Sequence, residues 1–96
     1  LFAPNIAGMT DAPIRERLEA ALGLRVVLEN DANAAGYAEH RYGAARDFSS
    51  SVFVTISTGI GGGYVARDGA VLRGASGRAT DFGHIKLDAA GEPCYC

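Results

Sequence analysis

Asp31 is the residue whose type and surroundings best suit a catalytic role in this sequence. It follows the apolar run 24–28 and the pair Glu29-Asn30, and an alanine-rich segment, 32–42, comes after it. A carboxylate at such a junction can accept a proton from a substrate hydroxyl as a general base. It can also serve as the N-cap of the following helix, which is worth about 1 kcal/mol. The residues alone favour the cap, and the two roles are compatible.

A glycine-rich stretch forms the second candidate site. The run 52–56 has the β-branched and aromatic composition of a strand, and it leads into Ser57, Thr58 and Gly59, with three more glycines at 61–63. Such a density of glycine is unfavourable inside a strand or helix, whereas it lets backbone pass close to a ligand. Successive N–H groups at a turn can bind an anion. We therefore predict a phosphate-facing turn, and the alternative is a glycine-rich hairpin without a ligand.

Three possible metal ligands stand near the end of the chain. His84, Cys94 and Cys96 are the residue types that tetrahedral zinc prefers, and the cysteines are too close in sequence to favour a mutual disulfide. A structural zinc site needs a fourth ligand, which this sequence does not show. The alternative is a pair of free cysteines and a surface histidine.

Helical and strand patterns alternate around these residues. Asp11 and Pro13 are typical of a helix start, the apolar spacing over 14–22 predicts a helix, and Gly23 suits its C-terminus. The other expected elements are strands at 24–28, 52–56, 64–67, 70–72 and 85–87, a helix at 32–42, a polar loop at 43–51 and a hairpin turn at Asp68-Gly69. This succession predicts an α/β fold in one domain.

Composition excludes several classes of protein. The chain has 96 residues, 48% of them hydrophobic and 21% charged, and its net charge of −2 provides no basic excess for nucleic acid. No apolar run approaches the roughly 20 residues of a membrane span, and no signal peptide is visible. The cysteine usage favours a reducing, cytoplasmic setting. The chain lacks an initial Met and stops inside a motif, so we expect a segment, 1–96, of a longer protein that continues at both ends.

Four ordered motifs together resemble one family. Residues 28–35 match "ENDANAA", 55–63 match "STGIGGG", 73–77 with 83–84 resemble "RGASG…GEIGH", and 94–96 begin "CxCGxxGC". The chain is thus similar to the ROK family of repressors, open reading frames and kinases, which includes bacterial glucokinases and N-acetylhexosamine kinases. The resemblance covers nearly the whole chain.

The resemblance implies part of an actin-like (ribonuclease H-like) ATPase fold. It also implies transfer of the γ-phosphoryl group of ATP to a sugar hydroxyl, with Mg²⁺ and a structural zinc ion. The partners would be a sugar and a nucleotide, with no membrane, no nucleic acid through this segment, and a possible homo-oligomer. The implied site residues are Asp31 as base; Asn30, Asp81, His84 and Asn5 at the sugar; Thr58, Gly59, Gly61, Gly62 and Gly63 at the phosphates; and His84, Cys94 and Cys96 at zinc.

The chain departs from the family pattern in several places. Asp81 replaces the glutamate of "GEIGH", Thr80 replaces its first glycine, and Tyr95 stands between the cysteines where glycine is usual. A first phosphate motif near "DxGGT", a third cysteine, a later sugar-binding glutamate and the adenine pocket are absent, so we expect the isolated chain to be inactive. Two alternatives remain: the sugar-sensing domain of a ROK repressor, and a zinc-stabilised interaction module.

Overall fold

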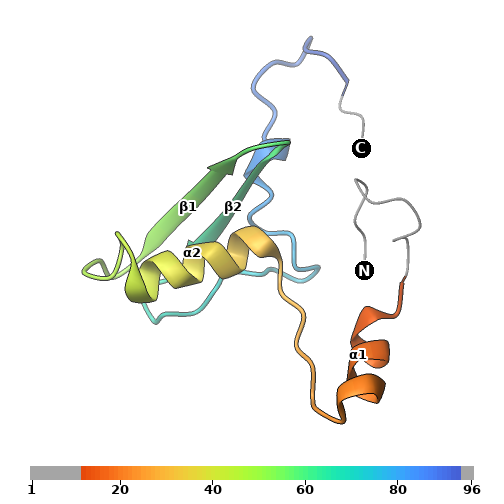
Figure 1. Cartoon of the computed structure of the whole chain (residues 1–96). Coiled ribbons are helices and arrows are strands. Elements are labelled where there is room, and N and C mark those ends of the chain that lie inside the picture. The colour runs from red at the N-terminus through yellow and green to blue at the C-terminus, as the bar shows by residue number, and fades with distance from the viewer. Residues whose placement is uncertain (1–11, 94–96) are drawn as a thin grey trace. The chain divides into compact units, whose positions relative to one another are not determined.

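The computed structural model describes residues 12–93 (Figure 1). These residues belong to two compact units, one containing Glu29–Ala89 and the other the described residues on either side of it. Each unit is described by itself. Neither of the two α-helices within residues 12–93 has the length and apolar character that a bilayer crossing requires.

The first unit contains helix α1, Ile14–Leu22, whose predicted bounds are confirmed. Pro13 precedes the helix with φ of −80°, which suits a helix start. Gly23 ends it in the left-handed conformation at φ 65°, and its N–H donates to the Glu19 carbonyl at 2.9 Å. The other predicted start signal, Asp11, lies outside the described residues.

The predicted strand at residues 24–28 is wrong, because this segment has no regular structure. The Val26 N–H donates to the Glu19 carboxylate at 3.0 Å, and the Leu24 and Val27 side chains are exposed. A strand is stable only when its backbone groups pair with a neighbour. In the described part of the chain, the segment has no strand partner.

The second unit is a helix packed on a two-stranded hairpin. Helix α2 spans Asp31–Tyr42, close to the prediction, and strands β1, Ser51–Ile56, and β2, Ile60–Val65, pair antiparallel. Figure 1 shows α2 crossing one face of the hairpin, and both strands contact it. Ala32 of α2 and Val65 of β2 are buried between these layers.

The glycines at 61–63 lie inside β2, so the prediction that they form the turn is wrong. Their role in packing explains the error. A Cβ on Gly63 would come within 2.8 Å of the Ala32 carbonyl oxygen, and a Cβ on Gly61 within 3.5 Å of the Ala32 Cβ. On the opposite face, a Cβ on Gly62 would collide with the Phe82 ring. Glycine is needed at positions 62 and 63, because Phe82 and the first turn of α2 lie against the β2 backbone there, whereas a Cβ on Gly61 would make only ordinary contacts.

The chain beyond β2 turns at Asp68-Gly69 as predicted, with Gly69 at φ 79°. The returning segment forms only an isolated bridge, Val65 to Val71, with backbone hydrogen bonds from Ala66 N to the Ala70 carbonyl at 2.8 Å and from Leu72 N to the Tyr64 carbonyl at 2.9 Å. The predicted strand 70–72 is therefore reduced to a bridge. The predicted strand 85–87 is wrong: the nearest element is the 3₁₀ helix η1, Phe82–His84, and 85–87 has no regular structure.

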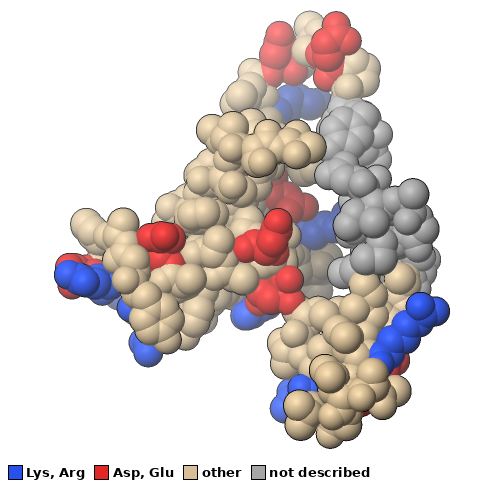
Figure 2. Space-filling model, in the orientation of Figure 1, with Lys and Arg blue, Asp and Glu red and all other residues tan. Residues whose placement is uncertain are grey.

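The surface view in Figure 2 shows acidic and basic side chains interspersed on the face toward the viewer. No continuous basic patch appears among the described residues on that face. On the sheet face away from α2, Phe82 covers Gly62, while the side chains of Val52, Val54, Ile56 and Ile60 are each more than half exposed.

Candidate functional site

The start of α2 presents Asn30 and Asp31. Asn30, not Asp31, is the N-cap: its Oδ1 accepts a hydrogen bond from the Asn33 N–H at 3.0 Å. The prediction that Asp31 caps the helix is therefore wrong, because Asp31 is already the first helical residue. The Asp31 carboxylate is exposed, and its Oδ1 accepts from the Ala32 N–H at 2.9 Å. Since the cap occupies Oδ1 of Asn30, the Nδ2 amide is the group that Asn30 can offer to a ligand.

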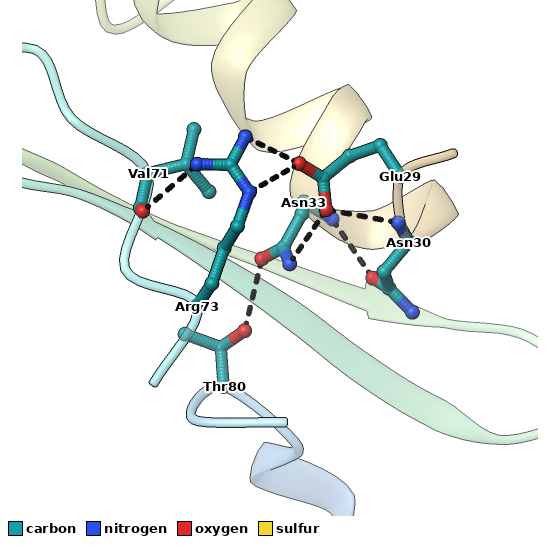
Figure 3. Close-up of polar contacts among 6 residues, drawn as sticks. All are labelled: Glu29, Asn30, Asn33, Val71, Arg73 and Thr80. Atoms are coloured by element: carbon teal, nitrogen blue, oxygen red, sulfur yellow. Dashed lines mark hydrogen bonds and ion pairs between the residues drawn. The ribbon is translucent and has the colours of Figure 1, made fainter. Parts of the chain in front are cut away.

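Glu29 directly precedes Asn30, and its carboxylate accepts hydrogen bonds from Asn30 and Asn33. Its Oε1 accepts from the Asn30 N–H at 3.0 Å and from Asn33 Nδ2 at 3.3 Å. Its Oε2 accepts from Arg73, with Nε at 2.6 Å and Nη2 at 2.5 Å (Figure 3). Burial would raise the pKa of the Glu29 carboxyl, but the hydrogen bonds from Asn30, Arg73 and Asn33 and the charge of Arg73 outweigh it, so the pKa is lowered.

Asn33 continues these contacts into the interior. It is only 1% exposed, and its Oδ1 accepts from the hydroxyl of Thr80, which is 3% exposed, at 3.0 Å (Figure 3). Among the described residues no buried side-chain nitrogen or oxygen lacks a hydrogen bond. A buried amide and hydroxyl that bind each other fix both chain segments, because breaking the bond would leave them unsatisfied.

Asp81 directly precedes the 3₁₀ helix η1, and His84 is the last residue of that helix. The His84 N–H donates to the Asp81 carbonyl at 3.0 Å, and both side chains are exposed. A Cβ on Gly83 would collide with the Ile60 carbonyl, so η1 lies directly on β2. The Thr80–Asn33 bond thus joins the segment of Asp81 to that of Asn30.

The turn between β1 and β2 consists of Ser57, Thr58 and Gly59, all exposed. The Ser57 N–H donates to the Gly59 carbonyl at 2.9 Å. Gly59 differs from the glycines of β2: a Cβ there would have no atom within 4 Å, and its φ is not positive. The fold gives no reason for glycine at this position.

The remaining predicted site residues do not enter this geometry. Asn5, Cys94 and Cys96 lie outside the described residues. Within residues 12–93, no group of three or more His, Cys, Asp or Glu side chains could hold a metal ion. The zinc site at His84, Cys94 and Cys96 therefore stays a prediction.

Sequence reasoning assigned no role to Glu29, Asn33, Arg73 or Thr80, which make the most connected contacts of the site. Glu29 and Arg73 are 44 positions apart, and Asn33 and Thr80 are 47 apart. Thr80 gave a signal, since it departs from the family pattern where glycine is expected. The sequence carried no signal for the Glu29–Arg73 ion pair, because a single sequence does not show which acidic residue lies beside which basic one.

Comparison with solved structures defines the class of protein to which this fold and site belong. The ROK hexokinase from Thermus thermophilus is 53% identical, with a TM-score of 0.81 over 90% of this chain and 29% of that one. A ROK glucokinase from Streptomyces griseus, solved with glucose and AMPPNP, is 42% identical, with a TM-score of 0.80 over 92% of this chain and 28% of that one. The chain therefore carries part of the α/β, actin-like ATPase fold of sugar kinases.

The chain belongs to the ROK family, whose sequence profile matches residues 1–96. Glucokinase from Streptomyces coelicolor is 41% identical over 95 residues, which are 99% of this chain and 29% of that protein. N-acetylmannosamine kinase from Citrobacter koseri is 42% identical over 92 residues, 96% of this chain and 31% of that protein. The chain thus spans less than a third of the relatives it matches.

Proposed function

We propose that a protein containing this chain transfers the γ-phosphoryl group of ATP to a hydroxyl of a hexose or N-acetylhexosamine. The observation that carries the proposal is the exposed Asp31 carboxylate beside Asn30 at the start of α2. Similar proteins are a glucokinase and an N-acetylmannosamine kinase, which supports sugar phosphorylation in general.

Asp31 acts as the general base in this proposal. A sugar hydroxyl is a weak nucleophile, and a carboxylate within hydrogen-bond reach orients it and accepts its proton as the phosphoryl group arrives. Asn30 donates from Nδ2 to a second sugar hydroxyl, because its Oδ1 is held by the helix cap. Asp81 and His84 approach the sugar from the η1 turn, and Asn5, which lies outside the described residues, stays a predicted sugar contact.

The nucleotide phosphates bind at the β1–β2 turn. Thr58 supplies a hydroxyl and Gly59 leaves the backbone open, since no atom lies within 4 Å of where its Cβ would be. The glycines at 61–63 act less directly: they allow α2 and Phe82 to pack against β2 and so fix the turn that they follow. Bound Mg²⁺ would supply neutralisation of the phosphate charge.

The remaining parts of the proposal concern the whole protein. We propose that the isolated 96 residues are inactive, since the sequence lacks the first phosphate motif and the adenine pocket. Zinc held by His84, Cys94 and Cys96 would be structural, and such a site suits a reducing cytoplasm. A homo-oligomer is compatible with these assignments.

The test is a steady-state assay of a chain of the relatives' full length that contains these residues. ADP release is measured with glucose, fructose, N-acetylglucosamine and N-acetylmannosamine, for the parent protein and for Asp31→Asn. We expect ATP-dependent phosphorylation of one sugar, and a loss of at least about 100-fold in kcat for Asp31→Asn. Asp47→Asn, which removes an exposed carboxylate of the loop after α2, is the matched control.

Full activity in Asp31→Asn would overturn the assignment of the base. Sugar binding without any ATP-dependent phosphorylation of the four sugars would overturn the kinase proposal and favour a sugar-sensing domain.

A further inference from the structure

We propose that Glu29 and Arg73 are positioning residues that hold Asn30 and Asp31 for the sugar, an inference that rests on the proposed function. With Asn33 and Thr80 they form a two-point clamp: Arg73, at the start of the loop 73–80, binds Glu29, and Thr80, at the end of the loop, binds Asn33. Figure 3 shows these side chains converging between the helix and the loop.

The Glu29 carboxylate is fully used within the protein. One oxygen accepts from Asn30 N and Asn33 Nδ2, and the other accepts two donors of Arg73. Charge-assisted hydrogen bonds of this kind are roughly twice as strong as neutral ones. Glu29 is therefore a support for its neighbours, with no oxygen left to bind a sugar.

Asn30 is held from two directions as a result. Its backbone N–H, which no helical carbonyl binds, donates to Glu29, and its side-chain Oδ1 accepts from Asn33 N. These contacts fix both the backbone and the amide plane of Asn30. The direction of Nδ2, and the position of Asp31 one residue later, are determined by the same two bonds.

The loop 73–80 is itself closed, so its two ends act together. The Ala79 N–H donates to the Arg73 carbonyl at 3.1 Å, and Gly74 and Gly77 take left-handed conformations with φ of 67° and 77°. Arg73 binds Glu29 at the start of the loop, and Thr80 binds the buried Asn33 at its end. A displacement of the loop would move Asp31 and Asp81 together.

The clamp is joined by hydrogen bonds to the sugar side of the site and not to the turn assigned to the phosphates. No residue of the Ser57–Gly59 turn shares a hydrogen bond with Glu29, Arg73, Asn33 or Thr80 in the described residues. Catalysis of phosphoryl transfer depends on alignment, and misplacement by 1 Å can cost about 100-fold in rate. Weakening the clamp should therefore lower the rate with sugar without weakening the binding of ATP.

The experiment measures kcat and both KM values for a chain of the relatives' full length, with the sugar it phosphorylates. Arg73→Gln is expected to lower kcat/KM for the sugar by about tenfold or more, with KM for ATP within about twofold of the parent. Glu29→Gln should have a similar effect. The double variant should be no less active than the less active of the two single variants, because both substitutions remove the same Glu29–Arg73 ion pair. Arg73→Lys, which keeps the charge but not the two guanidinium donors, should lose less than Arg73→Gln.

Arg46→Gln is the matched control, because it removes an arginine from an exposed ion pair with Asp47 at 3.5 Å. We expect it to leave kcat and both KM values unchanged. Thermal melting of each variant establishes the folded fraction, and Arg73 is itself 55% exposed, so its replacement should be tolerated.

Two results separate the positioning role from the proposed function. If Asp31→Asn is inactive while Arg73→Gln and Glu29→Gln behave like Arg46→Gln, the clamp is refuted and the kinase assignment stands. If KM for ATP rises as much as the sugar kcat/KM falls, the residues act on the fold as a whole and the clamp is refuted. If the parent protein phosphorylates no sugar, both proposals fail.

Discussion

Replacing Gly63 by alanine should destabilise the protein, because α2 lies against the β2 backbone at this position. A Cβ on Gly63 would lie 2.8 Å from the Ala32 carbonyl oxygen and 3.1 Å from the Asn33 Cα. Both are backbone atoms in the first turn of α2, so no side-chain rotation relieves the contact. Overpacking of this kind costs about 1–3 kcal/mol. Alanine restores about 0.4–1 kcal/mol by restricting the unfolded chain. With values near the middle of each range, the net expected loss is about 1–2 kcal/mol.

Gly59→Ala provides the matched comparison. Its Cβ would meet no atom within 4 Å, and the φ of Gly59 lies outside the left-handed region. We expect its stability to stay within about 0.5 kcal/mol of the parent or to rise slightly. If the turn binds phosphate, the added methyl group should instead raise KM for ATP.

Thermal and urea unfolding of both variants, followed by circular dichroism, measure the difference in stability. A loss of about 1–2 kcal/mol would lower the melting temperature by roughly 2–8 °C in a domain of 150–250 residues. The reasoning would be refuted if Gly63→Ala were as stable as the parent, or if Gly59→Ala lost as much. Either result would mean that close packing does not account for the glycines of β2.

Three further predictions concern the start of α2. Thr80→Val should cost about 1–3 kcal/mol in urea unfolding, because it leaves the buried Oδ1 of Asn33 without a donor; an unchanged midpoint would contradict this. Asn30→Ala should lose about 1 kcal/mol with the cap, whereas Asn30→Asp should keep that stability and still raise the sugar KM, since it lacks Nδ2. Burial raises the pKa of the Glu29 carboxyl, but the hydrogen bonds from Asn30, Arg73 and Asn33 lower it by more. The net pKa therefore lies below its ordinary value of 4.5. The contribution of the Glu29 carboxylate to folding stability should be complete above pH 4.5 and should fade as the pH falls through the lowered pKa. The difference in unfolding free energy between the parent and Glu29→Gln should therefore narrow when urea unfolding is repeated at decreasing pH.

Elements with strong local signals were predicted well from the sequence. Helix α1 begins after Pro13 and ends at Gly23, because a fixed proline φ and a left-handed glycine act through the nearest residues alone. The turn at Asp68-Gly69 follows from the same kind of local preference. Strand β1 was predicted within one residue, since its β-branched run is bounded by a polar loop and a serine turn.

The errors arose where packing against distant residues decides the structure. Residues 24–28 have strand composition but no described partner, and composition cannot supply one. The glycines at 61–63 look like a turn in sequence, yet they pair with β1 as part of strand β2, and at Gly62 and Gly63 the Phe82 ring and the Ala32 carbonyl occupy the space that a side chain would need. The cap at α2 was assigned one residue late, since both Asn30 and Asp31 are good capping residues and only the geometry distinguishes them.

The departure at position 80 acquires a physical meaning in this light. Glycine in the family pattern has no hydroxyl, whereas Thr80 is buried and donates to Asn33 Oδ1. A glycine here would remove that donor and leave the Asn33 amide oxygen to find another partner in the interior. Asp81, which follows directly, has a shorter side chain than the family's glutamate, so its reach depends more on where its backbone is fixed. Thr80, whose hydrogen bond fixes this backbone, thus directly precedes Asp81, whose reach depends on the position of the backbone. Exchanging Asp81 for glutamate alone should therefore be tolerated better than exchanging both residues to the family pattern, because only the double variant loses the Thr80–Asn33 hydrogen bond; the sugar kcat/KM of the single and double variants would reveal the difference.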